Sequence, residues 1–127
     1  MTCKVIKTDK APGAIGPYSQ GIFASSLLFV SGQLGMNPKT GELVSDNLDE
    51  QARQAVTNLC NIVKAAGGGV TDIVSVDVFI TNMQQFGEFN KIYQEFFSEH
   101  KPARAVVEVS ALPKGACVEI KCIAHIK

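Results

Sequence analysis

The segment from Leu48 to Ala66 constrains the fold of this chain more than any other part of the sequence. Its apolar residues recur at three- and four-residue spacing, which is typical of an amphipathic helix with one apolar stripe. The stripe consists of Leu48, Ala52, Ala55, Val56, Leu59, Cys60, Val63 and Ala66. Gly67-Gly68-Gly69 follows and predicts the C-terminal end of the helix. Such a helix must bury its stripe against a second layer of secondary structure.

The remaining apolar patterns predict that this second layer is a sheet. Residues 73–81 are apolar and β-branched enough for a central strand, with Asp77 as the exception. Further strands are expected over residues 2–7, 27–33, 104–110 and 117–126. A second amphipathic helix, with stop signals at His100 and Pro102, is marked by Phe86, Phe89, Tyr93, Phe96 and Phe97.

The predicted order is β-β-β-α-β-α-β-β, which indicates an α+β fold with two helices on one face of a mixed sheet. No internal repeat or linker divides the chain, so residues 1–127 are expected to form one domain. The strands over 73–80 and 118–126 carry apolar residues on both faces. A monomer would leave part of that surface bare, so we expect the protein to be an oligomer.

The composition disfavours several functional classes. There are 12 basic and 12 acidic residues, and neither sign forms a block, so a nucleic-acid-binding surface is not expected. No apolar run is long enough to span a bilayer, and the N-terminus does not resemble a secretory signal. The four cysteines form no Cys-x-x-Cys pair and have no histidine at metal-ligand spacing. We therefore expect no metal and a reducing, cytoplasmic setting.

Two isolated charges stand inside otherwise apolar strands. Arg104 opens the strand that runs to Val109, and Glu119 lies between Val118 and Ile120. A buried charge needs a partner, a ligand or water. Arginine offers a rigid two-pronged donor for a carboxylate, and glutamate can orient or deprotonate a water molecule. The two charges suggest a pocket for a small carboxylic acid, with an internal ion pair or two solvent-facing side chains as the equal alternative.

The separation of these two charges depends on how the last two strands are connected. If the connection is a hairpin, Glu119 lies opposite Glu108, and Arg104 is on the order of 10 Å from Glu119. Such a gap is wide for a salt bridge and suits a small ligand. The alternative is that another strand lies between the two.

Five further residues are candidates for lining such a pocket. Asn90 and Phe86 share a helix face at four-residue spacing, although a core phenylalanine and a surface asparagine are the ordinary roles. Ser31 and Gly32 end an apolar strand, where a glycine lets a ligand approach the main chain and a free N–H can bind an anion. Tyr18 lies in an irregular loop, where a packed lid is more common than a catalyst.

Several motifs give the sequence a resemblance to a known family. In chain order they are residues 15–20 (IGPYSQ), 30–33 (VSGQ), 37–41 (NPKTG), 50–55 (EQARQA), 89–93 (FNKIY), 102–104 (PAR) and 118–120 (VEI). Their order and spacing resemble the RidA/YjgF family, the reactive-intermediate (2-imino acid) deaminases. The resemblance covers essentially the whole chain.

This resemblance implies a chorismate-mutase-like fold and a homotrimer with a central β-barrel-like core. It also implies hydrolysis of 2-iminobutanoate and 2-iminopropanoate to 2-keto acids and ammonia, without a cofactor. Arg104 falls where the family clamps the substrate carboxylate, and Glu119 falls where it holds the hydrolytic water. The pocket-lining positions, to which two subunits contribute, are those of Tyr18, Ser31, Gly32 and Asn90.

The chain departs from the family pattern at Val106, where many members carry a cysteine. A thiol-dependent reaction at this position is excluded. If the family instead uses the main-chain carbonyl there to hold the imine nitrogen, valine serves as well.

Two other functions are compatible with the same residues. The first is a non-catalytic protein that binds a keto acid or amino acid in the same interfacial pocket, although retention of both Arg104 and Glu119 favours an enzyme. The second is the ribonuclease or translation-inhibitor activity ascribed to some family members. The balanced charge and the lack of an exposed aromatic and basic platform disfavour it.

Overall fold

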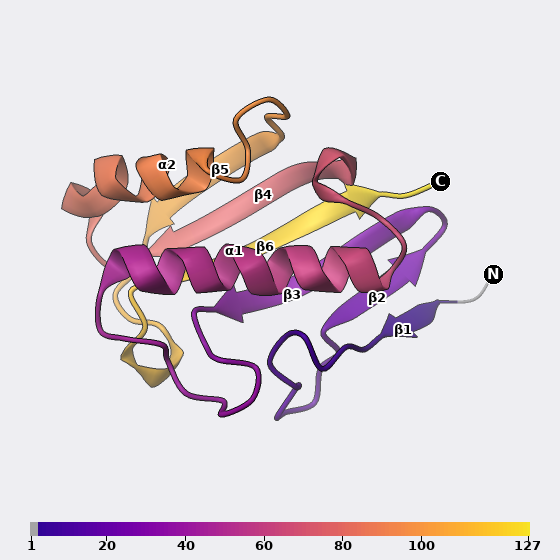
Figure 1. Cartoon of the computed structure of the whole chain (residues 1–127), viewed down its shortest axis with the longest axis horizontal. Helices are drawn as coiled ribbons and strands as arrows, with labels where there is room; N and C mark the ends of the chain where they lie inside the picture. Colours follow the sequence, from indigo (N-terminus) through magenta and orange to yellow (C-terminus); the bar gives the residue numbers. More distant parts are fainter. Residues whose placement is uncertain (1–2) are drawn as a thin grey trace.

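The structure, a computed structural model, describes residues 3–127 as one sheet with two α-helices lying on one of its faces (Figure 1). The strands are β1 (Lys4–Ile6), β2 (Gly21–Ala24), β3 (Leu27–Leu34), β4 (Ile73–Ile80), β5 (Ala103–Glu108) and β6 (Val118–His125). The helices are α1 (Leu48–Ala65) and α2 (Phe86–Gln94), with short 3-10 turns η1 (Val70–Asp72), η2 (Met83–Gln85) and η3 (Pro113–Gly115). The predicted element order and α+β class are confirmed.

The six strands follow the order β1-β2-β3-β6-β4-β5. Strands β4 and β5 run parallel, whereas the other neighbours are antiparallel. A parallel connection needs a crossover, which α2 supplies as the chain passes from β4 to the sheet edge at β5. The chain then returns as β6, which pairs with both β3 and β4. The hairpin considered from the sequence is therefore wrong, because β4 lies between β5 and β6.

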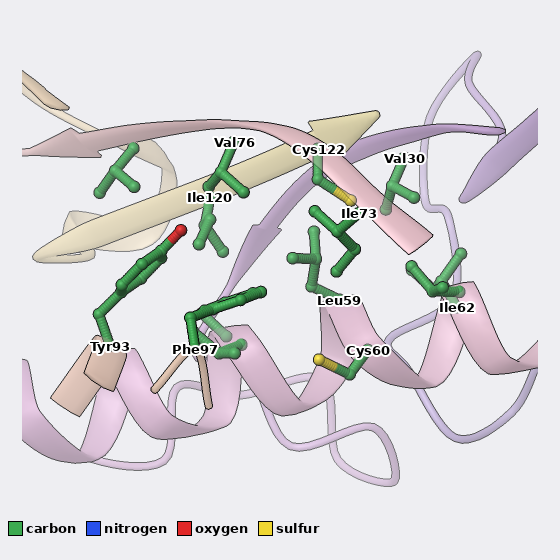
Figure 2. Packing of buried hydrophobic residues seen from close by; sticks show 14 of the residues in the cluster. Val30, Leu59, Cys60, Ile62, Ile73, Val76, Tyr93, Phe97, Ile120 and Cys122 are labelled. Atoms are coloured by element: carbon green, nitrogen blue, oxygen red, sulfur yellow. The ribbon is translucent and has the colours of Figure 1, made fainter. Parts of the chain in front are cut away.

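The core lies between the helices and the sheet (Figure 2). The apolar stripe of α1 is buried as predicted, and Val56 and Leu59 have no accessible surface. Cys60 belongs to the same stripe and packs as a small apolar side chain. Alternate residues of β4 and β6, such as Val76 and Ile120, point toward the helices and complete the core.

The second helix is shorter than the aromatic pattern predicts. It ends at Gln94, three residues before Phe97. Phe97 is nevertheless buried, and its ring stacks on that of Tyr93 with centroids 4.5 Å apart. The pattern continues past the helix because the following turn keeps the helical direction, with the N–H of Phe97 donating to the carbonyl of Tyr93 at 3.1 Å.

The sheet face opposite the helices carries exposed apolar side chains. Phe29 and Ile123 are cross-strand partners on this face, as are Phe79 and Val107. Phe29 and Val107 are each 44% exposed. Apolar residues on both sheet faces are what the sequence indicated, and association of the chain over the bare face stays a prediction.

Candidate functional site

Four residues predicted from the sequence line one cavity of about 450 Å³. They are Tyr18, Ser31, Gly32 and Glu119. The other walls come from the loop before β2, the end of β3 and the η3 turn: Pro12, Ile15, Gln33, Leu34, Met36, Pro113 and Lys114. A mostly apolar hollow with few polar groups has the character of a small-molecule site.

Gly32 lets the carboxylate of Glu119 lie against β3. The pairing of β3 with β6 shifts register between Val30 and Gln33, which leaves Ser31 and Gly32 in an irregular part of the strand. A Cβ atom at Gly32 would fall 2.4 Å from Oε2 of Glu119, which is too close for any side chain. Any side chain at this position would therefore displace the Glu119 carboxylate from its place against β3.

Burial raises the pKa of the Glu119 carboxyl above its ordinary value. Within residues 3–127 no cation lies within ion-pairing distance of it, and the salt bridge found there joins Arg53 to Glu95. The internal ion pair that the sequence left open is thus not formed in the chain. A partly desolvated carboxylate without a counter-charge is a stronger base than usual, which suits it to hold and activate water.

The raised pKa of Glu119 predicts how stability depends on pH. A carboxyl whose pKa is higher in the folded protein favours folding when protonated, and this contribution is lost as pH rises from its unfolded value of about 4.3 toward the folded one. We expect Glu119→Gln to match wild type below this window and to exceed its stability above it. Urea unfolding between about pH 3 and about pH 8 measures the difference. A difference that does not change with pH would contradict the prediction.

Ser31 fixes the loop that carries Tyr18. Its hydroxyl donates to the carbonyl of Ser19 at 2.6 Å, and its N–H donates to the carbonyl of Gln20 at 2.9 Å. Tyr18 is half-exposed and its side chain lines the cavity. The Ser31 hydroxyl is therefore already engaged with the loop, and Tyr18 is the more accessible of the two.

Gln20 organises the preceding loop, a role that the sequence analysis missed. The side chain is buried, and its Oε1 accepts from the N–H of Thr8 at 2.8 Å. Its Nε2 donates to the carbonyls of Thr8, Ala11 and Pro12. The signal that could have identified it is a long amide side chain between an irregular loop and a strand, where main-chain groups need hydrogen-bond partners.

Arg104 belongs to a second group of residues, formed with α2. Its Nη1 donates to Oδ1 of Asn90 at 2.8 Å. The guanidinium carbon lies 4.7 Å from the ring centroid of Tyr93 and 5.8 Å from that of Phe86. Asn90, Tyr93 and Arg104 also border a hollow of about 270 Å³. Asn90 and Phe86, which share a helix face as predicted, thus both contact the Arg104 guanidinium, and Phe86 is half-buried rather than in the core.

Val106 lies on the same face of β5 as Arg104 and packs partly against the core. The strand is at the sheet edge, so one side of its main chain has no neighbouring strand among residues 3–127. The N–H of Val109 donates to the carbonyl of Ile80 at 2.8 Å. Because main-chain groups alternate in direction along a strand, those of Val106 face the open edge.

The Arg104 and Glu119 groups lie on opposite faces of the sheet. Arg104 is level with Val76 of β4, and Glu119 is level with Phe79. Val76 and Phe79 are three residues apart, so their side chains point to opposite faces. Val76 is buried beneath the helices, which puts Arg104 on the helix side. The hairpin from which a gap on the order of 10 Å was expected is therefore not present. The alternative of an intervening strand holds, and one chain does not bring the two charges into one pocket.

The buried thiols have no thiolate character. Burial raises the pKa of Cys60 to about 11 and that of Cys122 to about 12 (Figure 2). Across residues 3–127, no three His, Cys, Asp or Glu side chains gather as a metal site requires. In the same range no helix combines the length and apolar character needed to cross a bilayer.

Comparison with known proteins identifies the family. The profile of the family described as endoribonuclease L-PSP matches residues 8–126. The chain is a member of this RidA/YjgF family. The resemblance carried by the sequence motifs is thereby confirmed.

Other RidA/YjgF proteins align with this member over nearly its whole length. A RutC family protein of Pyrococcus horikoshii is 46% identical over 122 residues, which are 96% of this chain and 97% of the relative. The human 2-iminobutanoate/2-iminopropanoate deaminase is 46% identical over 121 residues, which are 95% and 88% of the two chains. The solved structure of E. coli TdcF with bound serine has a TM-score of 0.93 and 44% identity, covering 98% of this chain and 99% of that one.

Proposed function

We propose that this protein hydrolyses 2-iminobutanoate and 2-iminopropanoate to 2-keto acids and ammonia, as a cytoplasmic homotrimer. The proposal rests on the separation of Arg104 and Glu119 on opposite faces of the sheet. Glu119 lies in an apolar cavity, and Arg104 has no carboxylate partner in residues 3–127. Two neighbouring copies, each contributing one sheet face, form a pocket that holds both charges. The human relative named as a deaminase of these imines supports the substrate class.

In this pocket Arg104 of one copy binds the substrate carboxylate. Its guanidinium is oriented by neutral groups, the Asn90 amide and two aromatic rings, so its positive charge stays available to an anion. A planar guanidinium can donate two parallel hydrogen bonds to a carboxylate. Serine, which is bound in the TdcF structure, is also a small molecule with a carboxylate next to a nitrogen-bearing carbon.

The main chain of β5 provides an acceptor for the nitrogen of the imine. The carbonyl of Val106 faces the open sheet edge, two residues from Arg104. It accepts a hydrogen bond from the protonated imine nitrogen while the arginine holds the carboxylate. Because this interaction uses the main chain, valine in place of cysteine leaves it intact.

Glu119 of the neighbouring copy orients a water molecule toward the imine carbon. Its carboxylate takes a proton from this water as the oxygen bonds to carbon. The amino alcohol that forms then receives the proton on nitrogen. As the C–N bond breaks, the hydroxyl proton passes through the Glu119 carboxylate to the departing ammonia, which leaves as ammonium, and the keto acid remains. The reaction consumes one water molecule and returns the carboxylate to its starting state.

Mixed oligomers test whether the pocket is shared between chains. Arg104→Ala and Glu119→Gln chains are each expected to have little activity alone. When the two variants are co-expressed in equal amounts, they mix at random in each trimer. About one interface in four then joins an intact Arg104 of one chain to an intact Glu119 of its neighbour. We therefore expect about a quarter of wild-type keto-acid formation from imine generated enzymatically in the assay, with light scattering to verify that trimers form.

The outcomes of this experiment separate the candidate functions. If wild type is active and the mixture is not, the two charges do not act across an interface. Wild-type protein that binds 2-oxobutanoate without accelerating imine hydrolysis would favour the binding-protein alternative. Cleavage of RNA by the same preparation would favour the endoribonuclease named in the family description.

A further inference from the structure

The groups that hold the side chain of Arg104 within residues 3–127 are neutral. No Asp or Glu oxygen in residues 3–127 lies within ion-pairing distance of it. Its contacts are the hydrogen bond to Asn90 and the faces of two rings, Tyr93 at 4.7 Å and Phe86 at 5.8 Å. All three partners come from α2, so this helix determines where the guanidinium points.

The ring of Tyr93 is the more rigid of the two aromatic contacts. Tyr93 is 7% exposed, whereas Phe86 is only half-buried at the start of the helix. The Tyr93 ring stacks on that of Phe97, with ring centroids 4.5 Å apart, and also contacts the Phe89 ring at a centroid distance of 5.7 Å. A ring fixed on its other sides by packing offers a cation a flat surface that does not move.

We infer that Tyr93 is the positioning residue of Arg104, whose ring face fixes the guanidinium in the direction needed to bind a carboxylate. The inference concerns the clamp of the proposed function. The aromatic pattern of the sequence accounts for Tyr93 as a core residue only, but one face of its ring contacts the cation.

The ring face, and not the hydroxyl, carries this role. The Tyr93 hydroxyl is buried and has no hydrogen-bond partner in residues 3–127. Burial also raises its pKa to about 12, so the group stays neutral. Figure 2 shows the oxygen directed toward the sheet, among apolar side chains. Phenylalanine is therefore expected to replace tyrosine here without loss of the stacking and without loss of stability.

The test compares three variants of the assembled protein. Tyr93→Leu removes the ring, Tyr93→Phe keeps it, and Phe89→Leu removes a neighbouring ring of α2 that is fully buried and does not contact Arg104. The first readout is ¹⁵N relaxation of the arginine Nε–H groups. The chain has two arginines, so Arg53 serves as an internal reference in each spectrum.

We expect the Arg104 Nε–H to be rigid in wild type, Tyr93→Phe and Phe89→Leu, and mobile in Tyr93→Leu. In the same series, calorimetric affinity for 2-oxobutanoate is expected to fall about five- to thirtyfold in Tyr93→Leu alone. An Arg104 Nε–H that stays as rigid in Tyr93→Leu as in wild type would overturn the inference. If wild type binds no keto acid but the relaxation pattern holds, the positioning role stands and the proposed function fails.

Discussion

Replacing Glu119 by glutamine is expected to lower imine hydrolysis by about two orders of magnitude or more, the usual loss when general-base assistance is removed. Glutamine keeps the size and much of the hydrogen bonding of glutamate but has no basic oxygen. It also fits beside Gly32, whose missing side chain leaves room for a planar group at this position. Binding of 2-oxobutanoate is expected to survive, because Arg104 still meets the carboxylate.

Two measurements decide this prediction. Keto-acid formation from enzymatically generated imine gives the rate, and calorimetric titration with 2-oxobutanoate gives the affinity. Glu42→Gln is a matched control, because it removes an acidic charge from an exposed position outside the cavity. If the Glu119 and Glu42 variants turn over equally fast, Glu119 has no part in the chemistry.

Exchanging Arg104 for lysine is expected to reduce kcat/KM by about ten- to a hundredfold, the range for losing a hydrogen bond to a charged group. Lysine keeps the charge but lacks the planar fork that fixes a carboxylate in two directions. It also cannot donate to Asn90 while lying flat on the Tyr93 ring. Stability is expected to change little, since Arg104 is exposed and makes no ion pair in residues 3–127.

Arg53→Lys is the natural comparison for this substitution. Arg53 is the other arginine of the chain and pairs with Glu95 between the helices, with both side chains about half-exposed. Near-normal turnover of Arg104→Lys, at the level of the Arg53 variant, would show that the carboxylate is held elsewhere.

Elements with a strong periodic pattern were predictable from the sequence. The stripe of α1 and the glycines after it defined that helix to within a residue, because burial of one face and a left-handed Gly67 (φ +93°) both leave sequence signals. The strand at 21–24 had no assigned range, although the predicted order required three strands before α1. It is four residues long, too short for alternation to distinguish it from a loop.

Strand pairing limited how far the site could be predicted. Alternation within a strand shows which residues share a face, but it does not say which strands are neighbours. A hairpin of β5 and β6 would have put Arg104 and Glu119 on the same face of the sheet. Because β4 lies between these strands, the two residues lie on opposite faces. Gln20 and Tyr93 were missed for a related reason. Periodicity does not show that the Gln20 amide meets the main chain of the preceding loop, or that a core ring such as Tyr93 also contacts Arg104.

If the proposed function holds, the opposite-facing charges make catalysis a property of the assembly rather than of the folded chain. Under the proposed function, an isolated chain is fully folded yet holds two incomplete half-pockets open to solvent. Its output per molecule rises with concentration until every chain has a neighbour, and becomes constant only beyond that point. A cell that makes two such chains with compatible faces would then contain hybrid pockets that neither gene encodes alone.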